Sequence, residues 1–352
     1  LGDDGQRYLL HHPFWVAFYA QGSARRLAQL AQALAQRFDA AVTTAEAARK
    51  DLFSGAVSVL AIHTANPVQQ RKVFYWAYQR FPDLDYFDAD VPFALSYAAR
   101  HGAMPLSRCR LQVRTGLVTE MAYSPTTSID GDVPALRLLA LAPNLDPEYL
   151  DPTELIAHFE GQERVYTLAD PALFLRRLDC LIRTYDPDII LTKWGDTWLL
   201  PFVLDYAARH NLSIALNRDL TQEVVRRKAF SYHTYGRVLH RGQQVHLAGR
   251  WHIDQTNAVM YGEYQLSGVL EQARITGLPV QEVARKSPGA GITAMQMITA
   301  MRRGVLVPYH KSQVESFKTP AQLIAADRGG LVGQPISGVH HQVAGIDFFS
   351  MY

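Results

Sequence analysis

The chain has 352 residues, of which 48% are apolar and 19% are charged. This is the composition of a globular protein, so we exclude a largely disordered chain. The length predicts two or three domains of ordinary size. The balance of 35 basic to 33 acidic side chains gives a net charge of +2. The overall charge therefore does not indicate a nucleic-acid-binding protein, and such a function would depend on local clusters.

Neither a membrane span nor a signal peptide is predicted. No apolar run approaches the roughly 20 residues that a membrane helix needs, and no basic segment followed by an apolar one opens the chain. Cys109 and Cys180 are far apart in the sequence and lack metal-ligand spacing. We therefore expect a cytoplasmic protein with no disulfide framework, no cysteine zinc site and no membrane partner. Because the chain starts at Leu1 and stops within a predicted strand or turn, we expect it to be part of a longer protein.

Residues 1–131 are predicted to form a β-rich domain. Ser23 is a typical helix N-cap, and Pro92 suits the first turn of a short helix that Asp90 opens. The expected elements are paired strands over 1–20, a helix after Ser23, a strand over 57–62, and helices over 68–81 and 90–97. The domain ends in a segment rich in Ser, Thr, Gly, Asp and Pro over 124–134.

Residues 132–310 alternate between apolar strands and amphipathic helices, which predicts a mostly parallel sheet covered by helices. The expected elements are strands over 136–141, 188–192 and 213–216, helices over 170–185 and 197–210, a hairpin of 237–240 with 245–247, and helices over 266–275 and 292–303. A polar connector over 311–318 then leads to strand-like segments over 331–335 and 343–347. The predicted fold class is therefore α/β, within an α+β multidomain arrangement.

Five segments, in chain order, resemble family B DNA polymerases. They are Tyr86–Phe93, which contains Asp-Val-Pro-Phe; Asp186–Ile190 followed by Leu200-Pro201-Phe202; Gly249–Asp254, of the form Gly-Arg-x-x-x-Asp; Ala273–Gly277 with Arg302–Gly304; and Asp347–Tyr352, similar to motif A. The resemblance implies an amino-terminal domain over 1–131 and an RNase H-like domain of the 3′–5′ exonuclease type over 132–310. It also implies that 311–352 is a connector and the start of the polymerase palm.

The segment similar to motif A implies a polymerase site. Asp347 would bind the magnesium ions that bridge the nucleoside triphosphate and the primer. Ser350, Met351 and Tyr352 would contact the incoming deoxynucleoside triphosphate. Because the partner carboxylate is not in this chain, we expect the fragment alone to bind no metal and to synthesise no DNA.

The exonuclease motifs of the family lack their acids in this sequence. Such exonucleases hold two metal ions with four carboxylates. Ala142 and Asn144 occupy the positions of the first pair, an Asp-x-Glu at a strand end. Trp194 and Leu199 fall at the second motif, and Gly268 at the Asp of the third. We therefore predict a degenerate exonuclease domain that guides DNA and supports the palm.

A cluster of cations and aromatic residues is the candidate DNA contact. It consists of Arg226, Arg227, Lys228, Tyr232 and Tyr235, and its expected ligands are template–primer DNA and a single-stranded 3′ end. The alternative interpretation is a solvated helix end that leads into a hairpin. His240, His246 and His252 are interpreted as surface residues of that hairpin rather than as zinc ligands.

Two other functions stay open at this point. One is an active 3′–5′ exonuclease that uses displaced acids, for which Asp146, Glu148 and Asp196 are the candidates. The other is a non-catalytic module that binds nucleic acid. Pro143 and Pro147 argue against the displaced acids, because they indicate that the strand has already ended.

Overall fold

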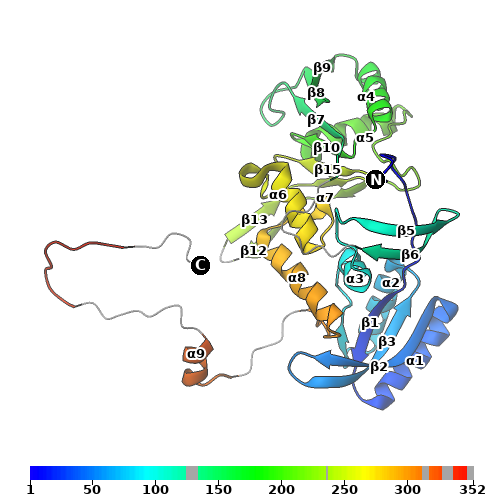
Figure 1. Cartoon of the computed structure of the whole chain (residues 1–352), viewed down its shortest axis with the longest axis vertical. Coiled ribbons are helices and arrows are strands. Elements are labelled where there is room, and N and C mark those ends of the chain that lie inside the picture. The colour runs from blue at the N-terminus through cyan, green and yellow to red at the C-terminus, as the bar shows by residue number, and fades with distance from the viewer. Residues whose placement is uncertain (124–133, 235–236, 311–316, 327–335, 347–352) are drawn as a thin grey trace. The chain divides into compact units, whose positions relative to one another are not determined.

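The computed structural model shows two compact units, Leu1–Tyr309 and His310–Tyr352 (Figure 1). The described residues are 1–123, 134–234, 237–310, 317–326 and 336–346. In these segments no helix has the length and apolar character needed to cross a membrane. The mixed α/β architecture that the sequence predicts is confirmed.

An antiparallel sheet in the order β2-β3-β1-β4 opens the first unit. Its elements are β1 (Val16–Gln21), β2 (Val42–Asp51), β3 (Gly55–Thr64) and β4 (Asp85–Phe87), with helices α1 (Ala24–Phe38) and α2 (Pro67–Arg80); a 3-10 turn, η1 (Asp39–Ala41), follows α1. Phe18 and Ile62 share one hydrophobic cluster with the two helices. Tyr19 and Ala61, the alternate residues, lie in another cluster with Leu306. Both faces of this sheet are therefore packed.

Both helices begin where the sequence predicts, because side chains cap them. Ser23 Oγ accepts a hydrogen bond from the backbone of Arg26 in α1, and Asn66 Oδ1 accepts one from Gln69 in α2. Pro67 occupies the first turn of α2, where its missing N–H costs nothing.

The paired strands predicted over 1–20 are wrong for most of that segment. Only the residues of β1 form a strand, and before it a single bridge joins His11 to Leu117. Tyr8 and Leu9 are both exposed, so the alternation there does not mark a buried face. The helix predicted over 90–97 is present as α3 (Phe93–His101), and the hairpin of β5 (Cys109–Arg114) and β6 (Leu117–Tyr123) follows it.

The central sheet has the order β15-β10-β7-β8-β9. Its strands are β7 (Leu138–Pro143), β8 (Glu154–Phe159), β9 (Gln162–Thr167), β10 (Ile189–Thr192) and β15 (Trp251–Asp254). Strands β7, β10 and β15 run parallel, and β8 is antiparallel to both of its neighbours. All four residues of β10 are buried, as expected for a strand covered on both faces.

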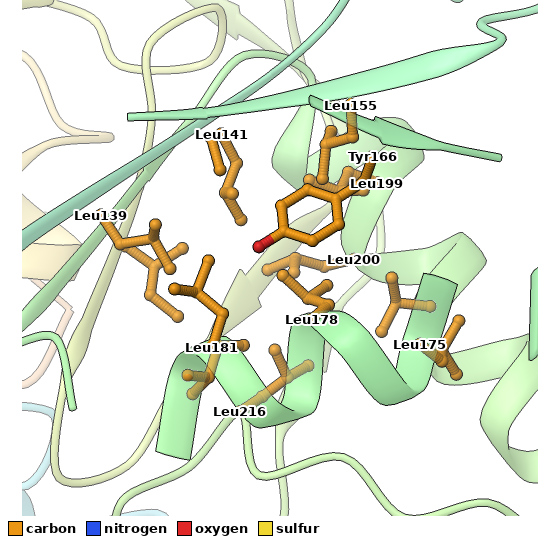
Figure 2. Close-up of a cluster of buried hydrophobic side chains, with 14 of the residues drawn as sticks. Leu139, Leu141, Leu155, Tyr166, Leu175, Leu178, Leu181, Leu199, Leu200 and Leu216 are labelled. Carbon is orange, nitrogen blue, oxygen red and sulfur yellow. The ribbon is translucent and has the colours of Figure 1, made fainter. Parts of the chain in front are cut away.

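Helices cover both faces of the central sheet. They are α4 (Pro171–Tyr185), α5 (Leu200–Arg209), α6 (Tyr261–Thr276), α7 (Val280–Val283) and α8 (Pro288–Arg302). Figure 2 shows Leu139 and Leu141 of β7 beside Leu178 of α4, within the cluster that also includes α5. Ile189 and Ile253 belong to the other cluster, together with α6, α7 and α8.

The two predicted domains of the first unit share this second cluster. Leu95 and Ala98 of α3 pack in it with residues of α6 and α8. After α8 the chain returns to β2, where Lys50 exchanges backbone hydrogen bonds with Gly304 and Leu306. The boundary near residue 131 lies outside the described residues, and the division into domains stays a prediction.

Two strand pairings differ from the prediction. Residues 213–216 form no strand, and β15 is the strand beside β10 instead. The predicted hairpin partners also separate: β13 (Arg237–Arg241) pairs with β12 (Phe230–Thr234), and β14 (Gln244–His246) pairs with β11 (Val225–Arg227). The physical reason is burial, because Val245 lies in the core whereas Val238 is exposed.

The second unit contains one helix among its described residues, α9 (Pro320–Ala326). Residues 317–325 and 336–346 are all exposed. The strand predicted over 343–347 is wrong for 343–346, since Val343 and Ile346 have no partner strand and face solvent. The segment 331–335 lies outside the described residues.

Candidate functional site

The positions predicted for the first nuclease motif lie at the carboxyl end of β7, the middle strand of the sheet. Ala142 is opposite Ile156 of β8. Asn144 follows the strand, and its Oδ1 accepts hydrogen bonds from the backbone of Thr153 and of Glu154, both at 3.1 Å. Its Nδ2 donates to Thr153 Oγ1 at 2.9 Å. The amide of Asn144 therefore holds the start of β8.

The segment predicted for the second motif forms a π-helix, η2 (Gly195–Leu199), that leads into α5. Trp194 precedes it with a left-handed backbone, φ 54°. Leu199 is completely buried, and Figure 2 shows it in the leucine cluster beneath the sheet, near Leu200 and Leu155. A side chain in this position contributes to the core.

Asp196, one of the candidate displaced acids, is also completely buried. Arg285 donates to both of its oxygens, from Nε to Oδ2 at 2.7 Å and from Nη2 to Oδ1 at 2.8 Å. Oδ1 also accepts from Val245 N at 2.7 Å, and Oδ2 accepts from Asn257 Nδ2 at 2.8 Å. Four donors saturate a carboxylate, so Asp196 has no acceptor site left for a metal ion.

Arg285 is itself held by backbone groups next to the sheet. Its Nη1 donates to the carbonyl oxygens of Gln281 and His252, at 2.8 and 3.2 Å. The Gln281 side chain accepts from the backbone of Leu247 and of His252, both at 2.9 Å. The segment around α7 thus supplies both the cation that pairs with Asp196 and a side-chain hydrogen bond to the backbone of β15.

The protonation states in this network follow from burial and from the neighbouring charges. Burial raises the pKa of Asp196, but the hydrogen bonds from Arg285 and Val245 and the neighbouring positive charge together more than offset this, and the pKa lies below its usual value. Burial lowers the pKa of His252 to about 4, so the ring is neutral at pH 7. Its Nδ1 lies 2.7 Å from the carbonyl oxygen of Val245 and carries the proton. The 3.5 Å approach of His252 to Asp196 is therefore not an ion pair at neutral pH.

The third motif position has no room for a side chain. Gly268 lies in α6, and a Cβ atom built on it would be 2.2 Å from the Cβ of Tyr264. Gln265, in the same helix, has a non-helical backbone with φ 55° and ψ −162°. An aspartate at position 268 would require this turn to change.

The remaining displaced acids lie in the loop after β7. Asp146 Oδ1 accepts a hydrogen bond from the backbone of Glu148 at 2.9 Å, and Glu148 is exposed. Across the described part of the chain, no group of three His, Cys, Asp or Glu side chains is arranged to hold a metal ion.

The cationic members of the candidate DNA contact are partly neutralised. Arg226 and Arg227 belong to β11 rather than to a helix end. Arg226 forms an ion pair with Asp205 at 2.5 Å, and Arg227 pairs with Glu282 at 3.2 Å. Lys228 is exposed.

Of the other predicted site residues, the structure describes only Tyr232. Tyr232 belongs to β12, whereas Tyr235 lies outside the described residues. The same holds for Asp347, Ser350, Met351 and Tyr352 of the segment similar to motif A.

Two of the three histidines taken for surface residues are buried. His252 lies inside the sheet, and the His246 ring lies 3.1 Å from Gln244 Oε1 in β14. His240 is exposed and contacts Ser231. Sequence reasoning also missed Arg285 and Gln281. The stretch over 280–286, Val-Gln-Glu-Val-Ala-Arg-Lys, mixes apolar and polar residues and gives no signal that these two side chains are buried.

No protein-family model matches the chain. DNA polymerase 3 of Saccharolobus solfataricus is 21% identical over 369 residues, which cover 86% of this chain and 47% of the polymerase. DNA polymerase 1 of Pyrococcus abyssi is 20% identical over 367 residues, which cover 88% and 45%. The family B DNA polymerase of Pyrobaculum calidifontis superposes with a TM-score of 0.60 at 18% identity, over 87% of this chain and 48% of that structure.

The chain is a homologue of family B DNA polymerases.

The resemblance read from the five segments is thus confirmed, and the fold corresponds to the amino-terminal and exonuclease region of such a polymerase. The chain spans about half the length of the polymerases it matches. The positions predicted for the nuclease motifs therefore lie on a fold of this type.

Proposed function

We propose that this chain is the amino-terminal part of a DNA-directed DNA polymerase of family B, with an exonuclease-like domain that does not cleave DNA. The observation that carries this proposal is similarity to DNA polymerases over 86–88% of the chain. The central sheet supports the RNase H-like assignment. Numbered in chain order, its strands are arranged 3-2-1-4-5, and only the second runs antiparallel to its neighbours. The cytoplasmic location remains a prediction from the cysteine content.

The proposal that this domain does not cleave DNA is supported by the residues at each predicted motif position. The side chains of Ala142 and Leu199 have no oxygen that could bind a metal ion. The Asn144 side chain is hydrogen-bonded to Thr153, and position 268 has no space for an acidic side chain. Asp196 is saturated by four donors. These residues do not fit the two metal ions of a proofreading exonuclease, so we derive no hydrolytic step at this site.

The polymerase chemistry would belong to the full-length chain. Asp347 would be one of the carboxylates that hold magnesium, which when bound neutralises charge on the triphosphate. Ser350, Met351 and Tyr352 would contact the deoxynucleoside triphosphate. The exonuclease-like domain would then act as a scaffold that contacts template and primer, with Lys228 and Tyr232 as candidate contacts.

A nuclease assay on this chain tests the silent domain. The substrate is single-stranded DNA labelled at its 5′ end, incubated with magnesium or with manganese, while fluorescence anisotropy follows binding. We expect binding without shortening from the 3′ end. Shortening that disappears in Asp146→Ala would show that the displaced acids work and would refute the silent site.

Primer extension by the full-length protein tests the polymerase site. Asp347→Asn should abolish synthesis without changing the unfolding midpoint, because it removes a metal ligand and keeps the side-chain volume. Asp327→Asn, at the preceding aspartate along the chain, is the matched control and should extend primers normally. Synthesis retained by Asp347→Asn would contradict the assignment.

A further inference from the structure

A cluster of arginines lies at the end of the central sheet opposite to the nuclease-like positions. Arg137 and Arg250 directly precede β7 and β15, and Asp188 directly precedes β10. Because these strands are parallel, their starts share one edge of the sheet. Arg7 and Arg218 reach the same edge and both form ion pairs with Asp188, at 2.6 and 3.0 Å.

The arginines in this cluster outnumber its carboxylates. The second carboxylate is Asp186, which contacts Arg218 at 2.9 Å and Arg250 at 3.3 Å, with Arg137 at 3.8 Å. Four guanidinium groups thus share two carboxylates, which leaves an excess of two positive charges.

Arg250 has unused hydrogen-bond donors. Its side chain is 4% exposed, and Nη2 donates to Asp186. Nε and Nη1 are buried and find no acceptor among the described residues. Burial lowers its pKa to about 10, so the group stays charged at neutral pH. A buried cation with unused donors is costly, and its uncompensated charge adds to the positive potential at this end of the sheet.

An open groove of about 840 Å³ adjoins the cluster at Arg137, which belongs to both. Arg164 of β9 and Arg177 of α4 also line the groove. Among its lining residues Glu160 is the acidic one. In the described structure neither Arg164 nor Arg177 forms an ion pair. The groove therefore continues the positive charge of the cluster.

Arg164 lies over an aromatic ring. Its guanidinium carbon is 4.9 Å from the centroid of Phe159, which is 8% exposed. Planar guanidinium groups stack on nucleobases, and they also pair with phosphate oxygens.

We propose that this arginine groove, formed by Arg137, Arg164 and Arg177 beside the Arg250 cluster, binds a ligand that carries both phosphate and a nucleobase. A single-stranded nucleic acid and a free nucleotide share this chemistry. The groove is lined by residues of β9 and α4 as well as by Arg137, and its three arginines suit a strand with several phosphates. The proposal does not rest on the polymerase function, because none of these residues belongs to the nuclease-like or motif A positions.

Fluorescence anisotropy with a 5′-labelled oligothymidylate and the chain as it stands tests the groove. We expect Arg164→Glu with Arg177→Glu to weaken binding at least about tenfold. The slope of log affinity against log salt should decrease by about 1.4, since each phosphate contact on a single strand contributes about 0.7. The matched control reverses two exposed arginines outside the groove, Arg71→Glu with Arg176→Glu, and should change the affinity by about twofold or less.

Competition with thymidine monophosphate and with inorganic phosphate distinguishes a single-stranded nucleic acid from a free nucleotide as the ligand. If the groove binds a strand, each should displace the labelled oligonucleotide only at concentrations far above that of an unlabelled one. If it binds a free nucleotide, thymidine monophosphate should bind alone with an affinity similar to that of the strand. Equal affinities of the groove and control variants, or no binding of any of these probes, would overturn the proposal. Loss of binding only in Lys228→Glu would contradict the groove and would instead support the contact proposed for the polymerase.

Discussion

Asp196 and Arg285 form a buried ion pair next to the predicted nuclease positions. Breaking a buried ion pair leaves one charge without compensation, which costs about 3–5 kcal/mol. We therefore expect Arg285→Met to lower the free energy of unfolding by about this amount, as measured by urea denaturation. Arg183→Met, which removes the exposed pair with Asp179 on α4, is the control and should cost about 0.5 kcal/mol.

The double variant separates the charge from the packing. Asp196→Asn together with Arg285→Met removes both charges, so part of the lost stability should return. If the double variant is as unstable as Arg285→Met alone, the Asp196 charge is not the cause and the site is held by packing.

His246 makes the stability of the fold depend on pH. Burial lowers its pKa from 6.5 to about 4, so between these values the unfolded chain binds a proton that the folded chain does not. The free energy of unfolding must therefore fall as the pH decreases through this window, by up to about 1.4 kcal/mol per pH unit for this group. Urea denaturation across the window should show that His246→Gln lacks this part of the dependence. Identical pH profiles for the two proteins would contradict the prediction.

At the scale of elements, the π-helix η2, which lies where the second nuclease motif is predicted, depends on Gly195. A Cβ atom there would lie 1.9 Å from Thr192 Oγ1 and 2.6 Å from His252 Nε2. Gly195→Ala should therefore cost about 1–3 kcal/mol, because Thr192 and His252 lie in packed strands that cannot shift freely. Urea denaturation measures the change.

Gly262 in α6 provides the matched control for this substitution. No atom lies within 4 Å of a Cβ built on it, and its backbone is helical. Gly262→Ala should stabilise the protein by about 0.5–1 kcal/mol, from helix propensity. If Gly195→Ala is equally harmless, η2 can relax and its close packing is not required.

The elements also show which predictions local sequence supports. Helices α1 and α2 agree with the prediction because Ser23 and Asn66 cap them through side chains a few residues away. The hairpin over 237–247 was wrong because a turn signal favours the nearest partner. The true partners depend on which strand is buried, and Val245 is buried while Val238 is exposed.

At the scale of the whole molecule, the chain divides into a unit that contains every hydrophobic cluster of the described residues and a unit whose described residues are exposed. The segment similar to motif A belongs to the second unit. Since the chain spans about half of the polymerases it matches, the synthetic activity we propose is a property of the full-length protein.

The sequence by itself determined the resemblance to family B polymerases and the absence of acids at Ala142, Asn144 and Leu199, because a missing carboxylate is missing in any fold. Only the tertiary structure decided that Asp196 is saturated by Arg285 and its neighbours, that Arg137 and the buried Arg250 meet at one end of the sheet, and that Arg137 and Arg164 line one groove. These contacts join residues that are far apart along the chain. Whether such residues meet, and whether they are buried when they do, depends on how the sheet and its helices pack.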